Sequence, residues 1–237
     1  MLRKLILTLA IAALLMTACA SPAPATEAPP ATGAAATSSV AEPPTAAAEP
    51  AASSGDDVRT YAIVADQTKA SYAVGEIFIN QNNRYNLAVG VTDAVGGEIF
   101  LNFTHPEQST VGPITVDIST LKSDSGRRDN AIRKDWLESA TYPIVTFTPT
   151  EIKTLPAEYA DGADITFEIV GDLTIRDTTR PTTFFVTARL EGEKLTGTAA
   201  TTILMSDFNF EAPDIAGILK AENEAKLELK FVALPTS

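Results

Sequence analysis

Apolar and polar residues alternate along most of the chain after residue 57. Near the C-terminus, for example, Leu227, Leu229 and Phe231 fall on one side of the alternation, and Glu228 and Lys230 fall on the other. Successive side chains of a strand point to opposite faces, so this period is typical of antiparallel sheet with one buried face and one solvated face. The pattern predicts strands over residues 59–64, 69–78, 86–91, 97–104, 111–118, 143–153, 165–175, 183–190, 194–205 and 223–234.

One stretch in the middle of this region changes to a helical period. From Asp124 onward the apolar spacing is that of a helix, with Ile132 and Trp136 four residues apart on one face. Asp124 or Ser125 can cap the helix, and Pro143 excludes helical angles at the residue before it. Many short strands and one short helix predict an all-β domain. The pattern alone leaves a sandwich and an up-and-down barrel open.

The N-terminal segment, residues 1–18, has the features of a lipoprotein signal peptide. Arg3 and Lys4 are followed by an apolar run over residues 5–16, which is too short to span a bilayer. The residues just before Cys19 resemble a lipobox, which predicts cleavage and lipid attachment at Cys19. The alternative is an ordinary secretory signal with an incidental cysteine.

Residues 19–56 are rich in Ala, Pro, Ser and Thr and contain no Lys or Arg. Such a composition cannot bury enough apolar surface to offset the entropy of ordering, so we expect a disordered tether. The folded domain is then predicted over residues 57–237. Together these segments predict an extracytoplasmic protein, lipid-anchored to the cell membrane or the outer membrane. A glycosylated stalk is the other interpretation of the tether.

Charge and rare residues exclude several functions. The chain has 18 Lys and Arg against 30 Asp and Glu, a net charge of −12, which opposes nucleic-acid binding. A single cysteine and a single histidine exclude an internal disulfide, a cysteine zinc cluster and a two-histidine metal site. We expect His105 to lie in a loop and to have no catalytic role. Strand acids such as Glu168 could meet across a barrel, but no spacing supports a catalytic pair. The protein is therefore predicted not to be an enzyme, with no catalytic residues and no metal.

Three motifs carry a family resemblance. They are RRD at 127–129 followed by YP at 142–143, GDLTIR at 171–176 followed by TRPT at 179–182, and MSDF at 205–208. From about Tyr61 to the C-terminus the chain resembles the YceI-like family, although Asp177 and Asn209 stand where the family pattern usually has glycine. The resemblance implies an antiparallel eight-stranded lipocalin-like barrel. It also implies that an isoprenoid or other amphiphilic lipid chain binds inside the barrel.

The inward-facing apolar residues are the candidate ligand-binding set. An eight-stranded barrel is just wide enough to be filled by side chains or to hold one small ligand. Ordinary core packing is therefore the alternative function of the same residues. The candidates are Leu101, Phe103, Val145, Phe147, Phe167, Phe184, Leu229 and Phe231. We expect no required cofactor, and a polyisoprenoid or fatty chain is the candidate occupant because burial of each methylene adds to affinity.

Arg127 and Arg128 have two interpretations. They could form a cationic rim for a lipid phosphate or carboxylate, since a guanidinium matches such groups. Alternatively, an ion pair with Asp124 or Asp129 fixes the helix on the barrel. A further ion pair between Asp129 and Arg133 has the favourable spacing for helix stabilisation.

The sequence thus predicts an exported, membrane-anchored carrier that holds an amphiphilic lipid in its barrel. A second hypothesis is a non-enzymatic envelope or stress protein with a filled barrel that binds a protein partner. The inward phenylalanines favour a filled barrel, whereas Ala188 and the threonines at 196–202 leave room. A third is a hydrolase or isomerase acting on a lipid within the barrel, against which the scarcity of His and Cys argues. An exposed edge strand could allow a homodimer.

Overall fold

The computed structural model describes residues 56–236. It contains one α-helix, α1 (Gly126–Ala131), followed directly by a π-helical turn (Ile132–Trp136). The strands are β1 (Val58–Ile63), β2 (Lys69–Phe78), β3 (Arg84–Thr92), β4 (Val95–Gly96), β5 (Glu98–Asn102), β6 (Thr110–Val111), β7 (Ile114–Asp117), β8 (Ile144–Lys153), β9 (Asp164–Ile175), β10 (Thr178–Glu191), β11 (Lys194–Leu204), β12 (Asp214–Ile215) and β13 (Leu219–Pro235). Short 3-10 turns lie at Ala65–Gln67, Ile79–Gln81, Pro106–Gln108, Ile118–Thr120 and Met205–Phe208.

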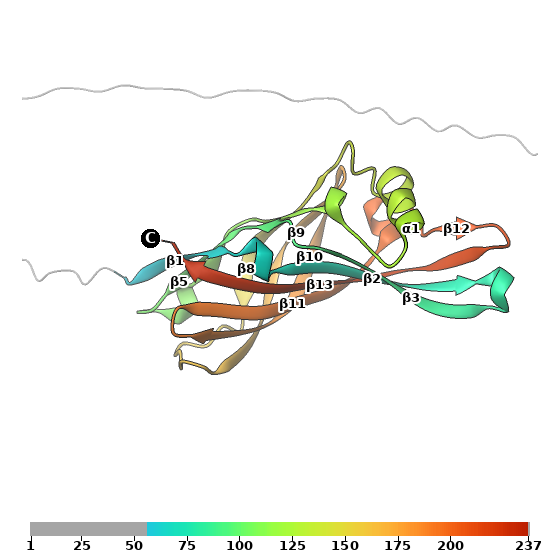
Figure 1. The fold of residues 1–237 in the computed structure, drawn as a ribbon. Coiled ribbons are helices and arrows are strands. Elements are labelled where there is room, and N and C mark those ends of the chain that lie inside the picture. Colours follow the sequence, from blue (N-terminus) through green and yellow to red (C-terminus); the bar gives the residue numbers. More distant parts are fainter. Residues whose placement is uncertain (1–55, 237) are drawn as a thin grey trace, which may run out of the picture. The chain divides into compact units, whose positions relative to one another are not determined.

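All of these strands belong to one antiparallel sheet that curls into a barrel (Figure 1). Several are pieces of a longer strand interrupted by a turn or a kink, and merging such pieces leaves eight runs and the two-residue strand β12. The runs are β1 with β2, β3 with β4 and β5, β6 with β7, then β8, β9, β10, β11 and β13. The run of β3, β4 and β5 closes the barrel, because β5 pairs with β1 and β4 pairs with β7. The expected all-β fold, an antiparallel sheet of lipocalin-like form with one short helix, is therefore confirmed, although the sheet contains thirteen strands rather than the expected eight.

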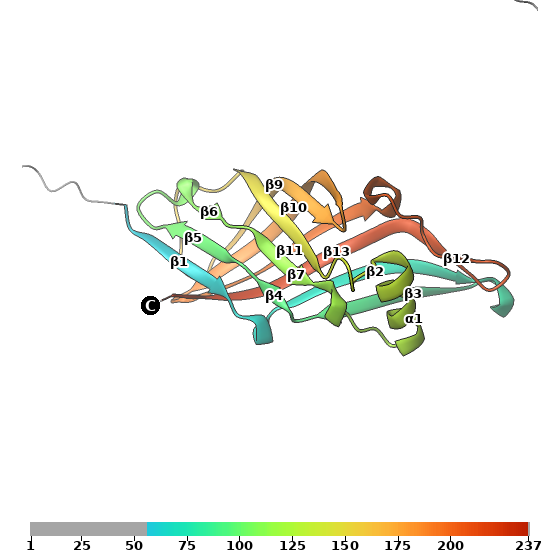
Figure 2. The ribbon, with the colours of Figure 1, turned by 90° about the horizontal axis from the view of Figure 1, so that it is seen from above.

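The longest strand, β13, pairs with both β1 and β2. Its C-terminal part pairs with β1, and its N-terminal part pairs with β2 through a register shift between Ala221 and Ala225. Beyond the barrel wall, β2, β3, β12 and the start of β13 continue as a projection, which we call the tongue (Figure 2). The outer face of β3 is unusually apolar, because Tyr85, Leu87 and Val89 alternate there and are all exposed.

The helical segment lies beside the tongue (Figure 1). Ser125 is the N-cap of α1, and its hydroxyl accepts a hydrogen bond from the backbone N–H of Arg128. The helix is shorter than the sequence pattern indicates, because the backbone widens to a π-helical turn from Ile132 onward. The predicted pair between Asp129 and Arg133 is wrong. Arg133 donates to the carbonyl oxygen of Leu121 and to the Asn130 side chain instead.

Two positions where the family pattern has glycine are explained by local geometry. Asn209 adopts a left-handed conformation with φ of 59°, which glycine and asparagine tolerate best. Its amide nitrogen donates to the Thr178 hydroxyl at 2.9 Å, which holds the turn. At the β9–β10 turn the residue with positive φ is Arg176, so Asp177 needs no glycine-like freedom.

The barrel interior contains two clusters of buried apolar residues. One surrounds Tyr61 and Ala233, and the other surrounds Leu173 and Phe208. Phe147 packs against both clusters and so connects them. In residues 56–236, no helix combines the length and the apolar character that a membrane-spanning helix requires.

Candidate ligand-binding cavity

The two apolar clusters do not fill the barrel. Between them lies a cavity of about 330 Å³, lined by the inward faces of most strands and by the helical segment. This volume falls at the lower end of the range of about 300–1,000 Å³ that is typical of small-molecule sites. The lining is almost wholly aliphatic and aromatic, so the cavity suits an apolar occupant.

Every candidate binding residue named from the sequence lines this cavity. The set comprises Leu101, Phe103, Val145, Phe147, Phe167, Phe184, Leu229, Phe231 and Arg128. Trp136 lines it as well, from the π-helical turn. The alternation of side chains therefore predicts the inward face, while the binding role of these residues stays a prediction. Cys19 lies outside the described residues.

Small inward residues on neighbouring strands leave the free space. Ala188 of β10 is buried and faces the cavity, as expected. On β11, however, the inward residues include Gly197 and Ala199, because Gly197 pairs with Ala188. Thr196 and Thr198 alternate with these residues and face outward, so the expectation that they leave room is wrong. Thr201 has the same parity as Ala199 and Ile203 and lies on the inward side. A completely filled barrel is also wrong, because the inward phenylalanines do not close the cavity.

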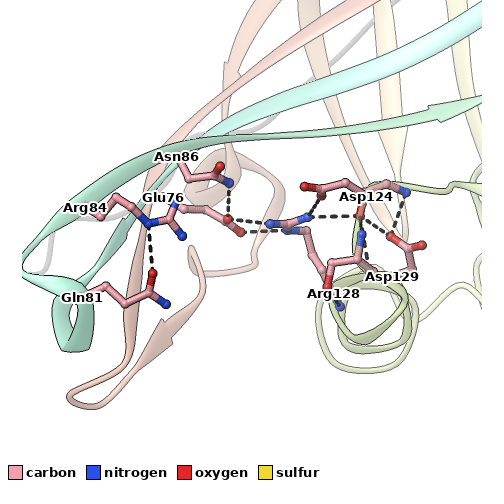
Figure 3. Close-up of polar contacts among 9 residues, drawn as sticks. Glu76, Gln81, Arg84, Asn86, Asp124, Arg128 and Asp129 are labelled. Carbon is pink, nitrogen blue, oxygen red and sulfur yellow. Dashed lines mark hydrogen bonds and ion pairs between the residues drawn. The ribbon is translucent and has the colours of Figure 1, made fainter.

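A polar group lies at the tongue end of the cavity lining (Figure 3). Arg128 reaches from α1 to Glu76 of β2, with Nε 3.0 Å from Oε1 and Nη2 2.9 Å from Oε2. The other terminal nitrogen of Arg128 donates to Asp124 and to the Ser123 hydroxyl. Asn86 of β3 also donates to Glu76, at 3.1 Å. The guanidinium therefore ties the helix to the tongue.

The charge of Arg128 is more than neutralised by its neighbours. Hydrogen bonding to Glu76, followed by hydrogen bonding to Asp124, raises the pKa of Arg128 above its ordinary value. Asp129 is not its partner, because that carboxylate accepts from the backbone and hydroxyl of Ser123. Arg127 is exposed and is absent from the cavity lining. The structure thus favours the helix-fixing ion pair over a cationic rim and replaces Asp129 with Glu76 as a partner.

Tyr72 brings a second polar group to the same end of the cavity. Its ring lies over Gly90, the residue opposite it on β3, where a side chain would collide with the ring. Burial raises the pKa of the Tyr72 hydroxyl to about 12, with Arg128, Asp129, Glu76 and Asp124 close enough to influence it. Within residues 56–236 this hydroxyl makes no hydrogen bond to another residue, and its oxygen is not fully buried, because the one fully buried unpaired side-chain polar atom there is Arg176 Nε.

Sequence reasoning missed both Tyr72 and Glu76. The signal was present in the strand at 69–78, where Ala70, Tyr72, Val74 and Glu76 alternate on the inward face. A carboxylate at an inward position of an apolar face needs a partner, because an unpaired buried charge is costly. Its partner is 52 residues away in the chain, so no local pattern indicates it.

The opposite end of the cavity has polar groups that already have partners. The Tyr159 hydroxyl lies 2.8 Å from Asp161 Oδ1 and 3.1 Å from the carbonyl oxygen of Leu190. Arg189 is paired with Asp164 and with Glu191. This end therefore offers fewer free donors to an occupant than the tongue end does.

The groups considered for catalysis and metal binding lie apart from the cavity. The His105 side chain is about half exposed, near Asp56 and Glu107. Glu168 lies on the outward face of β9 between two cavity-lining residues, Phe167 and Ile169. Within residues 56–236, no three His, Cys, Asp or Glu residues are grouped so as to hold a metal ion.

Comparison with solved structures supports the fold. BcnA of Burkholderia cenocepacia superposes with a TM-score of 0.55 at 20% identity, covering 72% of this chain and 98% of that one. A polyisoprenoid binding domain from Saccharophagus degradans superposes with a TM-score of 0.57 at 14% identity, covering 74% and 98%. At these identities the likeness concerns the fold alone.

Comparison with other sequences gives the family. A UPF0312 protein of Pseudomonas putida is 30% identical over 138 residues, which are 54% of this chain and 67% of the relative. Protein YceI of Escherichia coli is 30% identical over 120 residues, 49% of this chain and 57% of the relative. The model of the YceI-like domain matches residues 61–233. This match spans nearly the whole barrel, and the chain therefore belongs to the YceI-like family.

Proposed function

We propose that this protein is a non-enzymatic carrier that holds the apolar chain of an amphiphilic lipid inside its barrel. The observation that carries the proposal is the cavity of about 330 Å³, whose lining is apolar except at its two ends. A cavity with this lining excludes water from an aliphatic chain and leaves a polar head near one end. No covalent step is involved.

The class of ligand is supported by the polyisoprenoid binding domain from Saccharophagus degradans, which shares the fold. The physical argument is independent of that likeness. Transfer of each methylene from water contributes about 0.8 kcal/mol, so about ten buried methylenes contribute about 8 kcal/mol. The entropy of immobilising the chain reduces this gross figure, and micromolar affinity or weaker follows.

The proposal includes export and membrane anchoring. Its support is the signal-like segment 1–18, the single cysteine at position 19 and the proline-rich stretch that follows it. An anchored barrel would exchange lipid with the membrane that holds it. Metabolic labelling with a radioactive fatty acid, compared between the wild type and Cys19→Ala, tests the anchor. Equal labelling of the two proteins would refute it.

Native mass spectrometry of the protein purified from its own host tests the carrier function. We expect a co-purifying mass that organic extraction removes and that is identified as an isoprenoid or fatty chain. A bare protein mass, together with no uptake of added polyprenol, would contradict the proposal.

Two variants on one strand make this test specific. Ala199→Leu adds volume inside the cavity, whereas Thr198→Leu adds the same side chain on the outward face. We expect the first to reduce uptake and the second to leave it unchanged. Circular dichroism identifies any variant that fails to fold, and equal uptake by two folded variants would place the ligand elsewhere.

A further inference from the structure

The polar groups at the tongue end of the cavity contain more negative than positive charge. Around the Tyr72 hydroxyl lie one cation, Arg128, and three carboxylates, those of Glu76, Asp124 and Asp129. Both terminal nitrogens of Arg128 already donate to carboxylates. An anionic head group placed here would find no uncommitted cation and would be repelled by the excess of carboxylates.

One strong donor at this end has no partner. The Tyr72 hydroxyl lines the cavity, and no other described residue accepts its proton. Its ring is fixed by close packing over Gly90, so the position of the hydroxyl is set before any ligand arrives. The hydroxyl oxygen is not fully buried, so it stays accessible in the cavity, and an acceptor on a ligand would add one hydrogen bond there.

We propose that Tyr72 donates a hydrogen bond to an uncharged oxygen of the ligand's head group, and that the surrounding carboxylates exclude lipids with an anionic head. The inference rests on the carrier function proposed above and specifies its ligand class. The ligand is an apolar chain that ends in an alcohol, a carbonyl or an ester. The ion pair with Glu76 then keeps Arg128 from binding a phosphate on the ligand, so the cavity does not favour phosphorylated lipids.

Three probes with one chain and different heads test the inference. They are the hydrocarbon farnesene, the alcohol farnesol and farnesyl phosphate. Equilibrium dialysis against the full-length protein, with bound lipid quantified by mass spectrometry, gives the three dissociation constants. We expect farnesol to bind about two- to tenfold more tightly than farnesene, as one net hydrogen bond allows. Farnesyl phosphate should bind at least about tenfold more weakly than farnesol.

Substitutions identify the groups responsible. Tyr72→Phe removes the hydroxyl and should abolish the difference between farnesol and farnesene. Tyr85→Phe is the matched control, because Tyr85 lies on the outer face of β3 and is 57% exposed. Asp124→Asn removes one carboxylate from the end group and should narrow the gap between farnesol and farnesyl phosphate. A purely structural defect in Tyr72→Phe would weaken farnesol and farnesene alike, so the difference between them is the informative quantity.

The outcomes separate this inference from the carrier function. Failure to bind any of the three probes would overturn both. Equal binding of farnesol and farnesene, or tighter binding of farnesyl phosphate, would overturn the head-group inference and leave the carrier function intact. Loss of the farnesol preference in Tyr72→Phe but not in Tyr85→Phe would support it.

Discussion

Removing the side chain of Arg128 should destabilise the barrel strongly, because it leaves a carboxylate without its ion partner. The Arg128 side chain is 14% exposed and that of Glu76 is 8% exposed, so both charges are largely shielded from water. Breaking a buried pair by truncating one partner typically costs about 3–5 kcal/mol. Asn86 still donates to Glu76 after the substitution. We therefore expect a loss near the lower figure, about 3 kcal/mol for Arg128→Ala.

Urea unfolding followed by circular dichroism measures this loss directly. For a domain of this size, about 3 kcal/mol corresponds to a decrease of about 6–12 °C in melting temperature. Arg127→Ala is the matched control, since Arg127 is the preceding residue of the same helix and is exposed. Its effect should stay within about 0.5 kcal/mol.

A double variant separates the ion pair from simple loss of packing. Glu76→Gln combined with Arg128→Met removes both charges and keeps most of the volume. We expect it to be more stable than Arg128→Ala, because no buried unpaired charge remains; Asp124, the other ion partner, is 77% exposed. If Arg128→Ala is as stable as Arg127→Ala, the pair does not hold the helix to the tongue and the reasoning is wrong.

Three further results are expected. Gly197→Ala should lower the free energy of unfolding in urea by about 1–3 kcal/mol, because a β-carbon there would lie 2.6 Å from the Phe231 ring. The control is Gly126→Ala, whose β-carbon would meet no atom within 4 Å and which should be neutral or stabilising. Ser125→Ala removes the N-cap of α1 and should cost about 1 kcal/mol by the same assay. Burial raises the pKa of Tyr72 from 10.0 to about 12. Between these pH values the unfolded chain has lost a proton that the folded chain keeps, so stability falls as pH rises. Tyr72→Phe removes this group, so its free energy of unfolding should fall with pH by about 1–2 kcal/mol less than that of the wild type, allowing for partial solvent screening. Unfolding titrations at alkaline pH measure the difference, and an equal fall in the two proteins would contradict the raised pKa of Tyr72.

The sequence predicts the faces of the strands well, because alternation is a local property. Phe184 and Phe185 are adjacent in the chain, yet the first lines the cavity and the second is 63% exposed. A shift of one residue would exchange them, so the buried face fixes the assignment. This is why every residue of the inward set named from the pattern belongs to the cavity lining.

The pairing of distant segments could not be predicted in the same way. The ion pair of Glu76 with Arg128 and the β-bulge of β13 near Ala221 depend on how separate runs of the chain align in space. The π-helical turn from Ile132 is another such feature, since the apolar spacing of Ile132 and Trp136 also fits an ordinary helix. Local sequence patterns predict the helix and the strands, whereas the ion pair, the β-bulge and the π-helical turn depend on tertiary packing.

The order of strands around the barrel has a consequence for how the protein folds. The first strand, β1, pairs with the last strand, β13, so that Tyr61 lies opposite Pro235. A chain emerging from the ribosome can form hairpins early, but it cannot close the ring until β13 is complete. Contacts between such distant residues have a large entropic cost of loop closure, which makes folding slow compared with that of helical domains of similar stability. Until β13 is made, the β1–β2 run presents an open edge to other chains, so the newly made domain is most prone to aggregation before β13 has paired.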